Sequence, residues 1–268
     1  MMYKFIDSGE GKRLEDFGGI KLVRPCAHAI WPKKLSEKNW EKAEAHFSRK
    51  GEEKWSFLKK VPQKWEVEIS GIKLIASLTD FGHVGIFPEH AFFIEKLPRF
   101  SLKGKKILHL FAHTGLLTLA LAKKGASICH VDASKPAVEW AKENAKINKL
   151  QEAPIRWIVE DVGRFVKREL NRKVTYDAII LDPPSFGRGP KKEVFKIEKD
   201  LMPLLENLKG LLSKRPSFLL LTCHSPHFTP KVLERTLCSI FSLKERKIEA
   251  AEILLDNSLP LGSSISWY

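Results

Sequence analysis

An acid, two prolines and an aromatic residue follow a short apolar run in the second half of the chain. Residues 176–181 are typical of a buried strand, and Asp182, Pro183, Pro184 and Phe186 come directly after it. Prolines lack an amide hydrogen, so the strand ends there. Open α/β sheets bind ligands at the carboxyl ends of their strands, where a carboxylate, a carbonyl oxygen and a ring can hold a flat, nitrogen-bearing ring. An ordinary proline-rich turn explains these residues equally well, so the rest of the chain must decide.

Two further acids follow two earlier apolar runs. Asp132 comes after residues 127–131, and Asp161 comes after residues 155–159. In nucleotide-binding sheets an acid at the first of these places accepts hydrogen bonds from ribose hydroxyls, and one at the second can accept from an adenine amino group. Either could instead be a helix cap. Together with Asp182, these two acids favour a site for an adenosine ligand and a second substrate.

Residues 110–115 (LFAHTG) lie between a strand and a helix, where a cofactor can approach backbone donors. The pattern contains one glycine, Gly115, and is not Gly-x-Gly-x-x-Gly. By itself this turn is therefore a weak signal, and it gains weight from the acids that follow.

The chain from residue 100 to residue 268 alternates short apolar runs with helical patterns. This alternation is typical of a doubly wound, mostly parallel sheet of seven strands. Its last two strands are expected to form a hairpin-like edge joined through Pro260 and Gly262. The expected strands are 107–110, 127–131, 155–159, 176–181, 217–222, 247–255 and 264–268, and the expected helices are 116–124, 134–147, 162–170, 201–212 and 229–242.

Residues 1–99 are expected to form a smaller, β-rich accessory region. Residues 65–69 and 72–76 flank Ser70-Gly71, which predicts a β-hairpin with a two-residue turn. This region could also serve as an interface between copies of the chain, so a homo-oligomer is one interpretation.

The composition favours a cytoplasmic protein with a polyanionic partner. The 268 residues carry a net charge of +14 and are 43% hydrophobic, and no apolar run approaches the roughly 20 residues that a membrane span needs. A strongly basic chain is suited to nucleic acid. The four cysteines have no metal-ligand spacing, so reduced thiols and no metal are expected.

Four segments together resemble motifs of the class I S-adenosylmethionine-dependent methyltransferases, which have a Rossmann-like fold. They are residues 108–115, 131–134, 160–161 and 182–186. More narrowly, they resemble the bacterial 23S rRNA methyltransferases, which include cytosine-C5 and guanine-N7 enzymes. Residues 83–89 resemble the segment that precedes the first motif and helps to cover the cofactor. The resemblance implies S-adenosylmethionine as cofactor and a base of RNA, expected to be 23S rRNA, as the methyl acceptor.

Carried over by position, the resemblance implies a role for each motif. The turn 111–115 would pass the methionine part of the cofactor, Asp132 would take the ribose, and Asp161 would hold the adenine edge. Members usually have Asn or Asp where this chain has His109, which leaves the amino-acid end of the cofactor less defined. The expected cofactor contacts are Phe87, Phe111, Ala112, His113, Thr114, Gly115, Asp132, Ala133, Asp161, Val162 and Asp182.

The expected catalytic group is Asp182, Pro183, Pro184 and Phe186, which would hold the acceptor base beside the methyl group. Three basic residues that follow, Arg188, Lys191 and Lys192, could contact RNA phosphates or could belong to a solvated loop.

The atom that receives the methyl group depends on whether a cysteine is available. Carbon 5 of a pyrimidine becomes nucleophilic only after a thiolate adds to the ring, and the cytosine-C5 relatives carry that cysteine after the fifth strand. Alignment through His227 puts His224 at this position, and a shift of one residue would put Cys223 there. A small core residue is the favoured interpretation of Cys223, so nitrogen is the expected acceptor.

Two other functions fit the same sequence. A methyltransferase of this fold could act on a protein or a small molecule, because fold does not fix substrate. A non-catalytic nucleic-acid-binding protein could also retain the fold, although the three acids argue against it.

Overall fold

The computed structural model describes residues 1–49, 54–189, 193–241 and 247–268. The chain forms two compact units. One comprises Met1–Phe92 together with Leu254–Leu261, and the other comprises Phe93–Ile253 together with Gly262–Tyr268. The sequence predicted a single division of the chain, between residues 99 and 100. It did not predict that Leu254–Leu261 belongs to the N-terminal unit.

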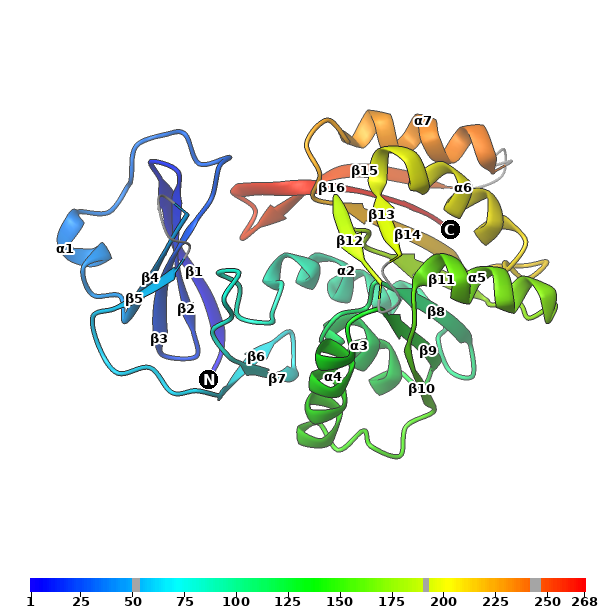
Figure 1. Cartoon of the computed structure of the whole chain (residues 1–268), viewed down its shortest axis with the longest axis horizontal. Coiled ribbons are helices and arrows are strands. Elements are labelled where there is room, and N and C mark those ends of the chain that lie inside the picture. The colour runs from blue at the N-terminus through cyan, green and yellow to red at the C-terminus, as the bar shows by residue number, and fades with distance from the viewer. Residues whose placement is uncertain (50–53, 190–192, 242–246) are drawn as a thin grey trace. The chain divides into compact units, whose positions relative to one another are not determined.

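A seven-stranded sheet forms the centre of the larger unit (Figure 1), as the sequence predicted. Its strand order is β10-β9-β8-β11-β14-β16-β15. The first five strands in this order are parallel, and β16 runs antiparallel to β14. The strands are β8 (Lys106–Leu110), β9 (Ser127–Asp132), β10 (Ile155–Val159), β11 (Ala178–Leu181), β14 (Phe218–Cys223), β15 (Ile248–Leu255) and β16 (Leu259–Trp267).

Helices cover both faces of this sheet, and Figure 1 shows α5, α6 and α7 grouped on one side with α3 and α4 on the other. Apolar residues of the first group share one core cluster with alternate residues of the strands. The helices are α3 (Leu116–Lys123), α4 (Lys135–Ile147), α5 (Val162–Asn171), α6 (Ile197–Lys209) and α7 (Pro230–Ile240). A side-chain oxygen caps the N-terminus of three of them, at Ser134, Asp161 and Thr229.

The hairpin of the last two strands differs from the prediction. β15 ends at Leu255, and β16 begins at Leu259, so Pro260 and Gly262 lie within a strand. The turn uses Asp256 and Asn257, both at positive φ (50° and 53°). Asp and Asn tolerate this left-handed backbone better than most residues, and the prediction gave more weight to Pro and Gly.

The N-terminal unit is rich in β-structure, as predicted. A five-stranded sheet has the order β1-β2-β3-β4-β5, and β6 and β7 form a separate hairpin with Ser70 and Gly71 at positive φ in its turn. The strands are β1 (Tyr3–Gly9), β2 (Lys12–Phe17), β3 (Ile20–Pro25), β4 (Ala45–Ser48), β5 (Lys54–Phe57), β6 (Trp65–Ile69) and β7 (Ile72–Ala76). The unit also contains the short helix α1 (Glu37–Trp40) and the 3₁₀ turn Pro88–His90. Helix α2 (Ala91–Lys96) continues into the larger unit, to which the 3₁₀ turn Leu97–Arg99 belongs.

A buried ion pair links β2 and β3 in this unit. Arg24 donates two hydrogen bonds of 2.8 Å to Glu15, which is fully buried, and Tyr3 donates a third of 3.0 Å. Burial alone would raise the pKa of Glu15, but the charges of Arg13 and Arg24 outweigh it and hold that pKa below its usual value. The carboxylate is thus the counter-ion of two arginines.

Glu15→Gln should destabilise the N-terminal unit strongly. Removing one partner of a buried ion pair leaves an uncompensated charge, which costs about 3–5 kcal/mol. Urea unfolding followed by tryptophan fluorescence measures the loss, and Glu41→Gln on the exposed end of α1 is the control. Equal unfolding midpoints for the two variants would contradict this role of Glu15.

Candidate active site

The ends of five parallel strands lie next to one another at one edge of the large sheet. In the sheet order, the segments that follow β10, β9, β8, β11 and β14 are therefore neighbours. These segments begin at residues 160, 133, 111, 182 and 224. The structure thus brings together the three acids that the sequence analysis singled out.

The turn after β8 has an unusual backbone. Phe111, His113 and Gly115 all have positive φ, at 54°, 48° and 88°. A non-glycine residue in this region is strained, so the surrounding structure must hold the turn in place. At Gly115, an added Cβ would lie 3.2 Å from the Cβ of Ala141 in α4, so a larger residue would push against the helix.

Asp132 connects this turn to the next strand. Its two carboxylate oxygens accept hydrogen bonds from the backbone amides of His113 and Ser134, each at 2.8 Å. Burial raises the pKa of Asp132, and these two amides partly counteract the effect. Each oxygen has a second lone pair, so the carboxylate could also accept hydrogen bonds from two hydroxyl groups, such as those of a ribose.

Asp161 has a structural role that the sequence analysis left open. Its Oδ1 accepts a hydrogen bond of 2.9 Å from the backbone amide of Arg164 and so caps α5. The cap uses one oxygen, which leaves acceptor capacity on the carboxylate. Val162 is buried beneath this position, and Ala133 is half-buried.

A threonine and two histidines form a buried network under the turn after β8. Thr118 Oγ1 lies 2.7 Å from His109 Nδ1 and 2.9 Å from His130 Nδ1. One hydroxyl has one hydrogen, so it donates to one ring and accepts from the other, which requires opposite tautomers. Burial, with the neighbouring His109 and His113, lowers the pKa of His130 well below its usual value. His109 is thus part of a core network.

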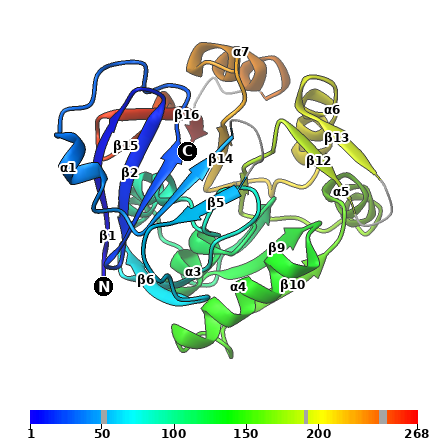
Figure 2. The same cartoon turned by 60° about the vertical axis from the view of Figure 1, so that its left-hand side comes forward.

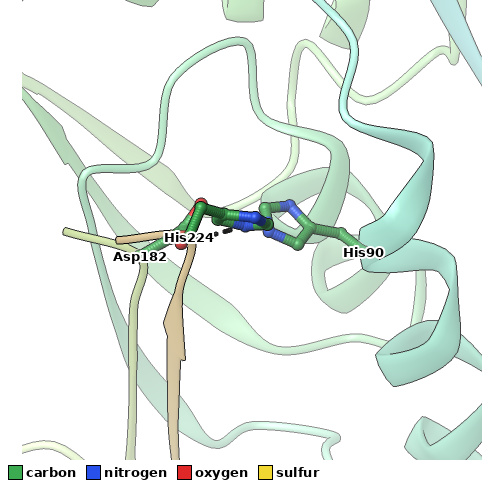
Figure 3. A group of neighbouring side chains, drawn as sticks. All are labelled: His90, Asp182 and His224. Atoms are coloured by element: carbon green, nitrogen blue, oxygen red, sulfur yellow. Dashed lines mark ion pairs between the residues drawn. The ribbon is translucent and has the colours of Figure 1, made fainter. Parts of the chain in front are cut away.

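Asp182 has two polar neighbours at the end of β14, shown in part in Figure 3. Thr222 Oγ1 donates a hydrogen bond of 2.7 Å to Asp182 Oδ1. His224 Nε2 lies 3.5 Å from the same oxygen, and the side chains of Asp182 and His224 are 18% and 31% exposed. Ser185 and Ser225 join the two loops through their hydroxyl oxygens, 2.7 Å apart. Sequence reasoning missed Thr222.

Cys223 is buried and is poorly suited to nucleophilic catalysis. The residue is 1% exposed and belongs to the core cluster between the sheet and its helices. Burial raises the pKa of its thiol, whereas an attacking thiolate requires a lowered pKa. The geometry therefore argues against methylation of a pyrimidine carbon through this cysteine.

The segment after Asp182 forms a small hairpin where the sequence analysis expected a loop. Strand β12 (Phe186–Arg188) pairs with β13 (Val194–Lys196), which leads into α6 (Figure 2). Pro183 is buried, and Pro184 is exposed. The predicted RNA contacts Lys191 and Lys192 lie outside the described residues. Strands of three residues give too short a pattern for sequence reasoning to detect.

The exposed residues of this hairpin are aromatic, basic and apolar. Phe186 is 51% exposed, and Arg188 lies over its ring at 5.8 Å. Opposite them in the register are Lys196 and Val194, which are also exposed. Phe195 contacts the ring of Phe111 in the turn after β8, with ring centroids 5.2 Å apart.

Phe87 lies in the N-terminal unit, where its ring is near those of His83 and His90. Its predicted contact with the cofactor therefore stays a prediction. In the larger unit, the carboxylates of Asp132 and Asp161 can accept hydrogen bonds, and the hydroxyl and amino groups of an adenosine can donate them.

Comparisons with known proteins agree in one class of enzyme. The family described as "Methyltransferase small domain" matches residues 72–203. A ribosomal RNA large subunit methyltransferase K/L from Vibrio parahaemolyticus is 32% identical over 212 residues, which are 78% of this chain and 29% of that protein. This chain spans less than a third of the length of the curated relatives it matches.

Solved structures extend the similarity over the whole chain. A SAM-dependent methyltransferase from Agrobacterium tumefaciens has 34% sequence identity and a TM-score of 0.90, covering all of this chain and 89% of that one. SMU.776, solved in complex with SAH, has 20% identity and a TM-score of 0.80, covering 99% of this chain and 75% of that one. The second likeness concerns the fold alone. Across the described parts of the chain, the helices are too short or too polar to span a membrane.

Thr118→Val should destabilise the larger unit more than Thr118→Ser does. Valine has the same shape but leaves two buried imidazole nitrogens without the hydroxyl, at a cost of about 1–3 kcal/mol for each buried group. Serine keeps the hydroxyl and loses only one methyl group, at about 1 kcal/mol. Chemical unfolding of both variants measures the difference, and a serine variant as unstable as the valine variant would refute the bridging role.

Proposed function

This chain belongs to the S-adenosylmethionine-dependent methyltransferases, and we propose that it transfers a methyl group to a nitrogen atom of a base in RNA, with 23S rRNA as the substrate. The observation that carries the proposal is the position of Asp182. It lies at the end of β11, next to the strand that precedes the turn 111–115, and it is followed at once by a hairpin with exposed aromatic and basic residues.

S-adenosylmethionine supplies a methyl group on a positively charged sulfur, which is already activated for transfer. The residues proposed to hold it are the turn 111–115, Asp132 with Ala133, and Asp161 with Val162. Asp132 would accept hydrogen bonds from the ribose hydroxyls, because its carboxylate is already oriented by two backbone amides. Asp161 would accept from the adenine amino group with the oxygen that does not cap α5.

The acceptor base would lie against Asp182, Pro183, Pro184 and Phe186. A base reached in this way must be unpaired or flipped out of its stack. The half-exposed ring of Phe186 would stack on it, and the Asp182 carboxylate would accept a hydrogen bond from it. Because the methyl donor is activated, the protein mainly has to align the acceptor nitrogen with the methyl group.

An RNA substrate is supported by the charges of the chain and by its relatives. The net charge is +14, and polyanions bind such proteins strongly. On the hairpin, Arg188 and Lys196 flank Phe186 and could contact the phosphates next to the target base. The K/L relatives are named as ribosomal RNA methyltransferases. A ribosomal substrate also favours the cytoplasm as the site of action.

Asp132→Ala should weaken the binding of S-adenosylmethionine. Loss of hydrogen bonds to a charged group costs about 1.5–3 kcal/mol, which corresponds to roughly tenfold to 100-fold in the dissociation constant. Isothermal calorimetry measures the affinity. Asp132→Asn, which retains one acceptor oxygen, tests the effect with less disturbance of the turn, and Glu139→Gln on the exposed side of α4 is the control. Unchanged affinity in both Asp132 variants would rule out this assignment.

Asp182→Ala should slow methyl transfer strongly while cofactor binding largely survives. Removing one group that stabilises the reacting centre slows such enzymes on the order of 100-fold or more. The assay is transfer of radiolabelled methyl groups to rRNA from a strain that lacks the gene, offered both as free RNA and as ribosomal particles. Label only in protein or in small molecules, or no label with any acceptor, would overturn the proposed function.

A further inference from the structure

We propose that His224 is the base that takes a proton from the acceptor nitrogen, and that the acceptor is therefore a nitrogen that carries hydrogen. This inference rests on the proposed function and adds to it a catalytic residue and a class of acceptor. Suitable acceptors are the exocyclic amino groups of guanine, adenine or cytosine and the ring N–H of guanine. The N7 atom of guanine does not belong to this class, because it reacts through a lone pair and has no proton to lose.

The position of the imidazole is the first argument. His224 follows β14 directly, and β14 pairs in register with β11, so the residue after each strand lies at the same edge. His224 Nε2 is 3.5 Å from Asp182 Oδ1 (Figure 3), and its side chain is 31% exposed. The pair thus places a basic nitrogen and a carboxylate side by side at the edge where the acceptor base is proposed to lie. Nε2 itself is buried, so the acceptor base has to displace the groups that cover it to reach this nitrogen.

The second argument is that neighbouring residues hold these two groups. Thr222 donates a hydrogen bond of 2.7 Å to Asp182 Oδ1, the oxygen that His224 also approaches, and so restrains the carboxylate. Gly262 in β16 leaves room for the imidazole: a Cβ at this position would lie 3.0 Å from His224 Nδ1 and 2.6 Å from the carbonyl oxygen of Cys223. Any other residue at position 262 would force His224 or the strand to move.

Transfer to a nitrogen that carries hydrogen leaves a proton for a base to remove. As the bond between the acceptor nitrogen and the methyl carbon forms, the bond between that carbon and sulfur breaks, and its electron pair stays on the sulfur. The nitrogen then carries one proton too many and must release it. His224 Nε2 accepts this proton, and the imidazolium that results is stabilised by the Asp182 carboxylate beside it.

Other groups of this edge are less suited to the task. A histidine has an ordinary pKa near 6.5 and an aspartate near 4, so the imidazole is the stronger base. The thiol of Cys223 is buried in the core with a raised pKa. His227 lies on the same loop but is exposed and has a positive φ of 72°, which makes it a matched control.

The experiment compares the wild type with His224→Asn, His224→Ala and His227→Asn. Single-turnover methyl transfer to rRNA from a strain that lacks the gene gives the rate, and calorimetry with S-adenosylmethionine checks that each variant is folded. We expect both His224 variants to bind the cofactor like the wild type and to transfer on the order of 100-fold more slowly, which is typical for the loss of a general base. His227→Asn should transfer at the wild-type rate.

Two readouts separate a base from a residue that merely supports the loop. Added imidazole should restore transfer in His224→Ala and should leave the wild type and His227→Asn unchanged. Nuclease digestion and mass spectrometry of the wild-type product, against nucleoside standards, should show a methyl group on an amino or ring N–H nitrogen.

The possible failures have different meanings. If the wild type places no methyl group on RNA, the proposed function fails and the role of His224 fails with it. If the wild type methylates RNA but the product is 7-methylguanine or 5-methylcytosine, the proposed acceptor class is wrong. Wild-type rates in His224→Asn, or slow transfer in His224→Ala that imidazole does not restore, would show that His224 is not the base.

Discussion

The parallel pairing of five strands is the constraint on which the candidate site depends. Leu110 and Leu181, the last residues of β8 and β11, pair in register, and Leu110 also pairs with Val131, the last residue but one of β9. Strands β11 and β14 are buried along their whole length. A shift of one residue would turn every side chain of a strand to the opposite face, so these apolar strands have a single register. The loops that follow them are therefore fixed as neighbours, although more than a hundred residues separate the first from the last.

The turn after β8 shows how strain and polar contacts balance at this edge. Two non-glycine residues there, Phe111 and His113, have a left-handed backbone, which costs of order 1–3 kcal/mol each. Asp132 accepts a hydrogen bond from the amide of His113, and the Thr118 network packs beneath the same turn. Hydrogen bonds to a carboxylate stabilise by about 1.5–3 kcal/mol. The cost of the backbone strain and the gain from these hydrogen bonds are similar in size. The turn therefore keeps this conformation only while Asp132 and the Thr118 network hold it.

Local patterns predicted much of this fold, because strand periodicity, caps and turn residues act over a few positions. The start of α4, expected at residue 134 and found at Lys135, and the Ser70-Gly71 turn are examples. Contacts between distant residues were not predictable in this way. Thr118 looks like any helix residue until His109 and His130 are placed around it. The same holds for the three-residue strands of the β12–β13 hairpin and for the return of residues 254–261 to the N-terminal unit.

The alternation of side chains along β14 explains why its end presents an imidazole and not a thiol. Successive residues of a strand point to opposite faces. Cys223 points into the core cluster with the helices, and Thr222 reaches Asp182. Exchanging Cys223 and His224 would require a shift of one residue, which the pairing of β14 with β11 and of Cys223 with Ser263 in β16 opposes. The register that buries the thiol is thus the same one that leaves His224 beside the carboxylate, so the packing of the sheet decides which side chain this edge presents.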